Sequence, residues 1–408
     1  MELKKYKLGK ILDVTRGASL SGEYYATEGD YIRLTCGNFD YQNNCFKENT
    51  SKDNLYYIGE FKPEFLMEKG DIITPLTEQA IGLLGSTAII PESEKYIQSQ
   101  DVAKIVCKED LLDKDFAFYL ISSAIVKQQL SAAAQQTKIR HTSPDKIKDC
   151  TVWIPELTEQ KRIGKLLRTL DSKIELNRAI NQNLEAMAKQ LYDYWFVQFD
   201  FPDENGRPYK SSGGEMVWNE KLKRFIPRGW ESSTLGNECQ MYQPKTLGLS
   251  ELDEFAKYKV YGANGIIGKY HAYNHENSEI AMACRGNSCG TVNRTAPFSW
   301  ITGNAMVIKM IDDSIHNEYI KQALRYANVE GAISGSGQPQ LTRENLNSIK
   351  LCKPTRELII RFSEQVSNIV EMYLQNESNI EELTKQRDEL LPLLMNGQVS
   401  VNSDLSDD

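Results

Sequence analysis

The sequence lacks any long uninterrupted apolar run, and this absence excludes a membrane-spanning helix. About 18 consecutive apolar residues are needed to cross a bilayer, and no segment of the 408 residues approaches that length. Residues 1–7 also lack the apolar core of a signal peptide. With 40% hydrophobic and 25% charged residues, the chain has a globular composition, and we expect a cytoplasmic protein with no membrane partner.

Cysteine is sparse, and its spacing is irregular. The eight cysteines include no C-x-x-C pair, so we expect reduced thiols and no disulfide framework. One cluster has the residue types of a structural zinc site, namely His271, His275, Cys284 and Cys289. Because its C-x4-C spacing is looser than that of the usual zinc knuckle, we favour buried thiols with surface histidines, and we predict no metal.

The sequence also lacks the motifs of the enzymes that act on nucleotides or DNA. There is no G-x-x-x-x-G-K-[ST] loop; the nearest match, 262–269, has the wrong spacing and is followed by Tyr270. Neither N-P-P-[FY] nor D-P-P-[FY], the tetrapeptides of adenine methylases, occurs. Asp53 with 60–62 (EFK) mimics a nuclease pattern, but matches this short are frequent by chance. We therefore predict no catalytic residues in this chain.

Positive charge is not in excess, since the net charge is −8. An average over the whole chain does not exclude nucleic acid as a partner, because phosphate binding needs only a local basic face. Part of the acid lies in residues 404–408, a short tail that we expect to be disordered.

What the sequence does contain is an internal repeat. Residues 147–155 and the stretch after them overlay residues 346–354 and the stretch after those, at an offset of 199 residues. In both copies alternating apolar residues predict a short strand that ends at a proline. Helical periodicity then continues for about 40 residues. Each copy is preceded by a strand-rich block that opens with Leu-Gly, at Leu8-Gly9 and Leu235-Gly236.

Both helical stretches carry an apolar seam with alternating steps of four and three, as in a coiled coil. The second series is Phe362, Val366, Ile369, Tyr373, Asn376, Ile380, Leu383, Arg387, Leu390 and Leu394, and the first is Ile163, Leu167, Leu170, Ile174, Asn177, Ile180, Leu184, Met187, Leu191 and Tyr194. The first series breaks at Asn177, which predicts a stammer. If the helices pair antiparallel, Asn177 and Asn376 can face each other and fix the register; the alternative is that both point to solvent.

Together these patterns predict an α+β protein. Two related mixed α/β domains are separated by two long helices that form an antiparallel coiled coil with pseudo-two-fold symmetry. The predicted segments are a first globular domain at 1–155, a first spacer helix at 156–198, a linker at 199–227, a second globular domain at 228–354, a second spacer helix at 355–398 and an acidic tail at 399–408.

Five segments make the chain recognisable. Residues 193–202 (DYWFVQFDFP), 211–217 (SSGGEMV) and 226–230 (IPRGW) strongly resemble the central region of the specificity subunits of type I restriction–modification enzymes. Residues 261–268 (YGANGIIG) and 285–292 (RGNSCGTV) resemble the target-recognition domains of that family. The resemblance covers nearly the whole chain in the right order, and the central run is its specific part.

The resemblance implies a division of labour between subunits. Each target-recognition domain would read one half of a split site in double-stranded DNA, and the paired helices would set the distance between the halves. The helices would also dock two methyltransferase subunits, which carry S-adenosylmethionine and modify adenine. Translocase–endonuclease subunits that use ATP and Mg²⁺ would complete the complex. No cofactor is implied for this chain itself.

Base reading needs Arg, Asn, Gln or similar side chains in exposed loops. Two loops at corresponding places, 135–142 and 334–343, have this composition. The candidates in them are Gln136, Lys138, Arg140, His141, Gln338, Gln340 and Arg343, and further candidates are Arg285, Asn287 and Arg294, with 77–79 at the matching place in the first domain. The alternatives are solvated loops without function, or a coiled-coil scaffold whose globular domains bind protein; such a scaffold would tolerate charge reversal in these loops.

Overall fold

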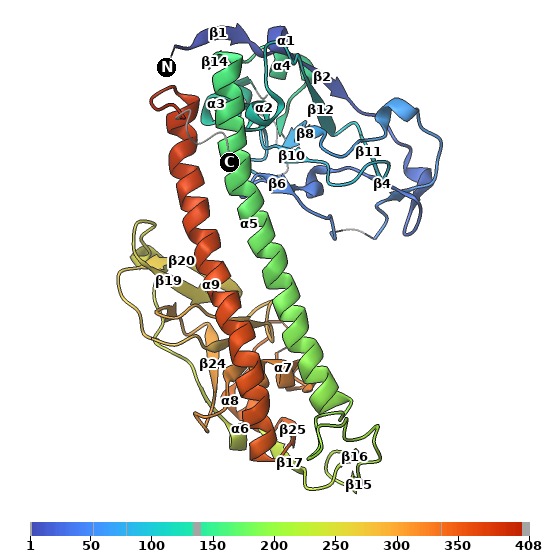
Figure 1. The fold of residues 1–408 in the computed structure, drawn as a ribbon, viewed down its shortest axis with the longest axis vertical. Coiled ribbons are helices and arrows are strands. Elements are labelled where there is room, and N and C mark those ends of the chain that lie inside the picture. Colours follow the sequence, from blue (N-terminus) through green and yellow to red (C-terminus); the bar gives the residue numbers. More distant parts are fainter. Residues whose placement is uncertain (1, 52, 79, 134–139, 336, 402–408) are drawn as a thin grey trace. The chain divides into compact units, whose positions relative to one another are not determined.

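The computed structural model describes residues 2–51, 53–78, 80–133, 140–335 and 337–401. They form two compact units. The first unit is Met1–Glu175 with Ile380–Asp408, and the second is Leu176–Asn379. The two longest helices, α5 (Leu157–Tyr192) and α9 (Arg356–Met395), each contribute a portion to both units (Figure 1). The predicted α+β class is confirmed, and no helix in the described ranges is long and apolar enough to span a bilayer.

The first unit places an antiparallel sheet between a helical layer and a second sheet. The main sheet has the order β10-β8-β12-β2, and the second has the order β11-β4-β7-β3. The elements are β1 Lys4–Lys7, α1 Leu8–Ile11, β2 Leu12–Arg16, β3 Tyr25–Ala26, β4 Tyr31–Arg33, β5 Phe39–Asp40, β6 Cys45–Phe46, β7 Tyr56–Tyr57, β8 Ile72–Pro75, β9 Thr77–Glu78, β10 Ala88–Ile89, β11 Tyr96–Ile97, β12 Val102–Cys107, α2 Lys114–Ile121, α3 Ala124–Ala133, β13 Arg140–His141, α4 Pro144–Lys148 and β14 Thr151–Ile154.

The second unit repeats this topology. Its main sheet, β18-β24-β21-β22, corresponds strand for strand to β2-β12-β8-β10. The elements are β15 Met216–Asn219, β16 Arg224–Pro227, β17 Glu231–Thr234, α6 Leu235–Glu238, β18 Cys239–Tyr242, β19 Tyr258–Gly262, β20 Gly265–Tyr270, β21 Ile280–Ala283, β22 Val292–Arg294, β23 Trp300–Ile301, β24 Ala305–Met310, α7 Asn317–Tyr326, α8 Arg343–Asn347 and β25 Lys350–Lys353.

The repeat predicted from the sequence extends to individual hydrogen bonds. In the first unit β1 pairs with β14, and in the second β17 pairs with β25, both antiparallel. The Leu8 N–H donates to the Cys150 carbonyl at 2.9 Å, and the Leu235 N–H donates to the Ile349 carbonyl at 2.8 Å. The two acceptors are 199 residues apart, which is the offset found in the sequence.

In both units, close packing explains the glycine of the Leu-Gly pair. A Cβ atom added to Gly9 would lie 2.9 Å from the Lys148 Cβ, and one added to Gly236 would lie 2.7 Å from the Asn347 Oδ1. The short helix at the start of each domain therefore packs so closely on α4 or α8 that only glycine fits.

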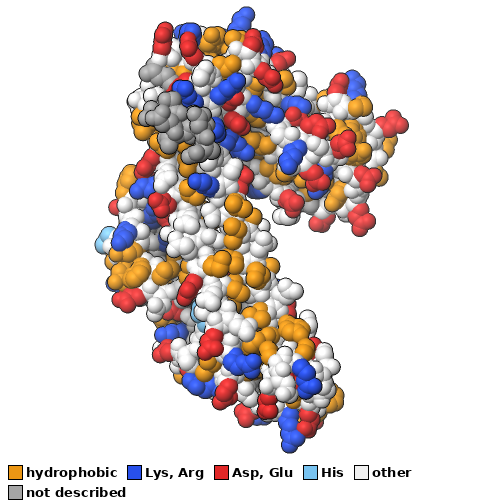
Figure 2. Space-filling view, in the orientation of Figure 1, with side chains coloured by type: hydrophobic (Ala, Val, Ile, Leu, Met, Phe, Trp, Pro, Cys, Tyr) orange, Lys and Arg blue, Asp and Glu red, His pale blue; other side chains and the backbone are white. Residues whose placement is uncertain are grey.

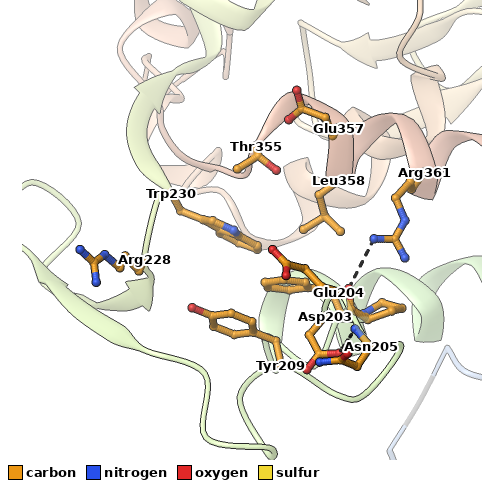
Figure 3. A pocket seen from close by; sticks show the side chains of 12 residues that line it. Asp203, Glu204, Asn205, Tyr209, Arg228, Trp230, Thr355, Glu357, Leu358 and Arg361 are labelled. Atoms are coloured by element: carbon orange, nitrogen blue, oxygen red, sulfur yellow. Dashed lines mark hydrogen bonds between the residues drawn. The ribbon is translucent and has the colours of Figure 1, made fainter.

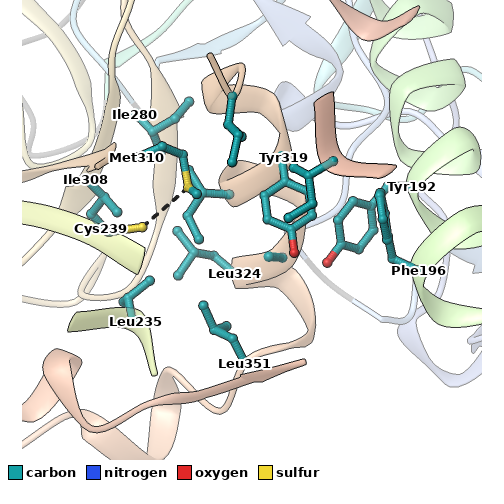
Figure 4. Close-up of a cluster of buried hydrophobic side chains, with 14 of the residues drawn as sticks. Tyr192, Phe196, Leu235, Cys239, Ile280, Ile308, Met310, Tyr319, Leu324 and Leu351 are labelled. Atoms are coloured by element: carbon teal, nitrogen blue, oxygen red, sulfur yellow. Dashed lines mark hydrogen bonds between the residues drawn. The ribbon is translucent and has the colours of Figure 1, made fainter. Parts of the chain in front are cut away.

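In each unit the core joins the main sheet, the helix that covers it and the buried stripes of α5 and α9. In the second unit Tyr192 and Phe196 lie beside Tyr319 of α7, while Leu235, Ile280 and Met310 surround the far side of that helix (Figure 4). In the first unit Ile163, Leu167, Leu394 and Met395 join the core formed by the sheet and α2. The long helices thus bury their apolar stripes partly against the globular domains.

The two long helices pair antiparallel in each unit. In the first unit the Arg387 Nη1 donates to the Asp171 Oδ1 at 2.9 Å, while Leu394 of α9 shares a core with Ile163 of α5. In the second unit the Asn376 Nδ2 donates to the Asn181 Oδ1 at 3.1 Å, and the rings of Phe362 and Tyr192 lie 5.9 Å apart between centroids. In both cases later residues of α5 meet earlier residues of α9, as the coiled-coil prediction requires.

The register within α5 differs from the prediction. All ten predicted seam positions of α9 are buried or half-buried. On α5 the buried seam residues after Ile174 are instead Asn181, Leu184, Ala188 and Tyr192. The heptad therefore runs on through Asn177, and an extra step of four comes at Ala188–Tyr192, next to a π-helical turn at Asp193–Val197. The predicted stammer at Asn177 is wrong.

The predicted asparagine pair is also corrected. Asn376 lies on the seam as expected, but its partner is Asn181, one turn beyond Asn177. The Asn181 Nδ2 also donates to the Glu377 Oε1 at 2.8 Å. The prediction placed Ile180 on the seam, where the structure has Asn181. A buried asparagine fits when the partner helix satisfies its amide, and such a pair fixes register.

Candidate nucleic-acid interface

In the first unit the structure brings the predicted reading loop to the end of a central strand. Strand β13 pairs antiparallel with β9, so that Arg140 lies opposite Glu78 and His141 opposite Thr77. The Thr142 N–H donates to the Leu76 carbonyl at 2.9 Å. Residues 140–142 of the predicted reading loop and the further candidates at 77–78 therefore lie together at the end of β8.

The second unit builds the same arrangement. Arg285, which follows β21, forms an antiparallel bridge with Gln340. The Leu341 N–H donates to the Cys284 carbonyl at 3.0 Å, as Thr142 does to Leu76. Because Thr142 and Leu341 are again 199 residues apart, the two loops occupy equivalent places in the repeat. Backbone hydrogen bonds hold the described part of each loop in the same place.

The candidate side chains in the second unit are exposed. They are Arg285, Asn287, Gln338, Gln340 and Arg343. Gly286, at φ +77°, turns the chain after Arg285, and its N–H donates to the Pro339 carbonyl at 3.0 Å. A turn held in this way presents amide and guanidinium groups to solvent, as contact with base edges requires.

In the first unit the reading loop is built on a charge pair. The Arg140 Nε lies 3.4 Å from the Glu78 Oε2, and the Glu78 side chain is almost fully buried. The other oxygen, Oε1, accepts from the Gly82 N–H at 3.0 Å. Arg140 therefore anchors the loop while its guanidinium stays partly exposed. His141 is exposed, with its Nδ1 3.3 Å from the Thr77 hydroxyl. Gln136, Lys138 and Gln79 lie outside the described residues.

Arg294 does not belong with the exposed candidates. Its side chain is 4% exposed and forms an ion pair with Glu318 of α7, which is 1% exposed. Burial lowers the pKa of the Arg294 guanidinium. The sequence placed Arg294 near the other candidates, but α7 covers this end of β22 with a matching carboxylate, so we withdraw Arg294 as a base-reading residue.

The ion pair is part of a buried charge network that the sequence did not reveal. The Lys321 Nζ lies 2.5 Å from the Glu185 Oε1 of α5 and 3.8 Å from the Glu318 Oε1. Burial, with the nearby Arg294 charge, lowers the pKa of Lys321 to about 8. The network fixes α7 against α5 within the second unit. Only the helical spacing of Glu318 and Lys321 could have indicated it, and that spacing is common on solvated helices.

Two of the four residues in the alternative zinc site have other partners. The His275 Nε2 lies 2.9 Å from the Tyr242 hydroxyl, and the Cys284 Sγ lies 3.1 Å from the Asn304 carbonyl oxygen. Among the residues whose placement is described, no three His, Cys, Asp or Glu side chains form a group that could hold a metal ion. In the nuclease-like pattern, the Lys62 amine forms an ion pair with Glu64, a residue outside the pattern.

The linker between the halves folds into an aromatic module with a cavity of about 520 Å³ (Figure 3). Phe201 stacks on Tyr209 at 4.7 Å and on Trp230 at 5.4 Å between ring centroids. The Arg361 Nη1 of α9 donates to the Pro202 carbonyl at 3.4 Å. These contacts tie the linker to the start of α9, so that the chain between the repeats is an ordered part of the second unit.

The second-unit portion of α5 carries an additional apolar stripe on its exposed side. Leu176 is 61% exposed and Met187 is 52% exposed, and Tyr194 and Val197 are exposed in the π-helical turn that follows α5. Leu176, Met187 and Tyr194 recur at helical spacing on one face, beside the buried seam. Apolar side chains are visible along this helix in the space-filling view (Figure 2). Exposed apolar side chains that recur along one helix face are typical of a surface that binds another protein.

Comparison with known proteins agrees with the geometry. The family model for the type I restriction modification DNA specificity domain matches residues 1–186 and 227–382. The HindI specificity subunit of Haemophilus influenzae is 24% identical over 97% of this chain and 99% of its own length. The MjaIX specificity subunit of Methanocaldococcus jannaschii is 22% identical over 74% of this chain and 73% of its own length.

A solved structure shows that the fold is shared as well. The S subunit of a type I restriction–modification system from M. genitalium has a TM-score of 0.63 at 19% identity, over 97% of this chain and 96% of that one. The chain therefore belongs to the family of type I restriction–modification DNA-specificity subunits.

Proposed function

We propose that this chain recognises a bipartite site in double-stranded DNA, with one half read by each globular domain. The observation that carries the proposal is the duplicated reading loop, anchored at the end of β8 in one domain and at the end of β21 in the other. At equivalent positions the loops carry different side chains, His141 opposite Thr77 and Gln340 opposite Arg285. Because different side chains favour different base edges, we expect the two half-sites to differ in sequence.

We propose that catalysis resides in partner subunits. Two methyltransferase subunits supply S-adenosylmethionine and modify an adenine in each half-site, and translocase–endonuclease subunits supply ATP hydrolysis and Mg²⁺-dependent cleavage. The exposed stripe of α5, from Leu176 to Val197, supports a protein partner on the long helices. A helix laid along such a stripe would bury side chains that water now surrounds.

Methylation patterns test the proposal directly. Cells that co-express this chain with its cognate methyltransferase subunit are expected to carry methylated adenines in a split, asymmetric motif. Single-molecule sequencing of their DNA would show that motif and its spacer. A stable complex that leaves no motif would contradict DNA reading and favour the scaffold alternative, in which the globular domains bind protein.

Placing a charge on the α5 stripe is expected to abolish capture of the methyltransferase subunit. Met187→Glu would bury a carboxylate in an apolar interface, which costs about 2 kcal/mol or more and weakens binding about 30-fold or more. Co-purification and analytical ultracentrifugation measure this. Gln182→Glu, on another exposed face of α5, is the matched control and should bind normally; equal loss in both variants would rule out the stripe as the docking surface.

A further inference from the structure

A glycine of positive φ marks the same surface position in both domains. Gly85 has φ +79°, and a Cβ atom there would lie 3.5 Å from the Leu130 Cδ1. Gly290 has φ +91°, and a Cβ atom there would lie 3.6 Å from the Val329 Cγ1. Gly85 precedes β10 and Gly290 precedes β22, which are corresponding strands of the two main sheets, so the two glycines hold equivalent places in the repeat.

In the first domain this position holds a cation without a partner. The stem of Lys127 passes close over Gly85, since a Cβ atom on that glycine would lie 2.9 Å from the Lys127 Cγ. Lys127 is half-buried, and burial lowers the pKa of its amine. No carboxylate in the described part of the chain pairs with it. A half-buried ammonium group without a counterion is costly, and a bound anion would remove that cost.

In the second domain the equivalent position is a pocket of about 610 Å³, whose charged lining residues are Lys321, Arg325 and Glu330. Lys321 and Arg325 of α7 line it beside Gly290, Thr291 and Asn328. Lys321 is committed to Glu185 at 2.5 Å. Arg325 forms a looser ion pair with the same carboxylate, since its Nη2 lies 3.9 Å from the Glu185 Oε2 and its side chain is 45% exposed. A guanidinium held this loosely has N–H groups left to donate to a ligand.

Both positions adjoin the reading loops. Gly85 follows the turn in which the Gly82 N–H donates to Glu78, the partner of Arg140. Helix α3, which carries Lys127, ends at Ala133, and β13 of the reading loop begins at Arg140. In the second domain the pocket is lined by Cys289 and Ile333. These two residues lie next to the bridged segments around Arg285 and Gln340.

We propose that Lys127 of α3 and Arg325 of α7 are phosphate contacts, which bind the DNA backbone beside the base-reading loop of each domain. The inference rests on the proposed function and adds to it a backbone site in each half. A phosphodiester oxygen accepts from the lysine ammonium as from a point charge, while the arginine can donate two hydrogen bonds to one phosphate. Such contacts position the protein on the duplex without reading sequence.

The salt dependence of DNA binding tests the inference. The complex of this chain with its methyltransferase subunits is titrated with a duplex that carries the methylated motif. Lys127→Met and Arg325→Met are each expected to lower the slope of log K against log salt by about 0.9. Each should weaken binding about fivefold at roughly 0.15 M salt, and the double variant should lose both contributions. The methylated motif should not change.

Two controls make the result specific. Lys127→Arg keeps the charge and should retain the slope. Lys114→Met removes the same charge from the opposite end of the neighbouring helix α2, where the side chain is exposed, and should change the slope little. Slopes for Lys127→Met and Arg325→Met no different from that of Lys114→Met would overturn the inference, as would a changed motif. If the unsubstituted complex does not prefer the motif duplex over random DNA, the proposed function itself fails.

Discussion

Replacing Asp171 with alanine is expected to destabilise the first unit by about 3–5 kcal/mol. The carboxylate is buried between the two long helices and the globular domain. Its Oδ1 accepts from the Arg387 Nη1 at 2.9 Å, and its Oδ2 accepts from the Tyr119 hydroxyl at 2.5 Å. Alanine would leave the Tyr119 phenol without its acceptor and the Arg387 guanidinium with only the exposed Asp388 carboxylate, and buried groups that lose their partner carry a large desolvation cost.

Equilibrium urea denaturation followed by circular dichroism measures the loss. Asp388→Ala is the matched control, because the Asp388 Oδ1 also accepts from Arg387, at 2.8 Å, but is 58% exposed. A surface pair contributes about 0–1 kcal/mol. Asp171→Leu combined with Arg387→Leu should recover much of the stability, since both charges are then removed. If Asp171→Ala costs no more than Asp388→Ala, the buried pair does not stabilise the unit.

Removing the exposed reading side chains of one domain is expected to relax one half of the methylated motif and leave the other half intact. Arg285→Ala with Gln340→Ala removes two side chains that lie opposite each other at the end of β21. A good contact with a base contributes about 1–3 kcal/mol of discrimination, or roughly 5- to 150-fold per base pair. The backbone bonds of the loop do not involve either side chain, so the fold should survive.

The methylated motif reports the result directly. His141→Ala in the first domain should relax the other half-site only, which assigns a half to each domain. Gln365→Ala, an exposed residue of α9, should leave both halves unchanged. An intact motif after the substitutions at Arg285 and Gln340 would show that these residues do not read bases. Equal loss of both halves would indicate a defect of assembly instead.

Much of the fold was predictable because its signals are local. The strand that ends at a proline and the long periodic stretch after it recur 199 residues apart, and periodicity distinguishes strand from helix within a short window. The seam of α9 was predicted at every position. The seam of α5 was not, because Asn181 is polar and Ile180 is apolar; a hydrophobic pattern selects Ile180, whereas the partner helix supplies hydrogen bonds that place Asn181 inside.

The candidate site was also predictable where its signals are local and not where distant residues decide. The two loops with amide and cationic side chains were predicted from their composition and from their equivalent places in the repeat. In the structure the first loop pairs with β9, and the second forms a bridge with Arg285. The sequence could not show that Arg140 also anchors its loop on a buried Glu78. It also could not show that Lys127 lacks a counterion beside Gly85.

By itself, the sequence determined the repeat, the secondary structure that follows from periodicity, the family and the position of the reading loops along the chain. Only the tertiary structure decided which charged side chains are buried and which are free to bind. Arg294 is enclosed by Glu318 of α7, and Arg387 by Asp171 of α5. The physical reason is that a charge is paired or exposed according to the distant elements that pack around it, and a local pattern holds no information about those elements.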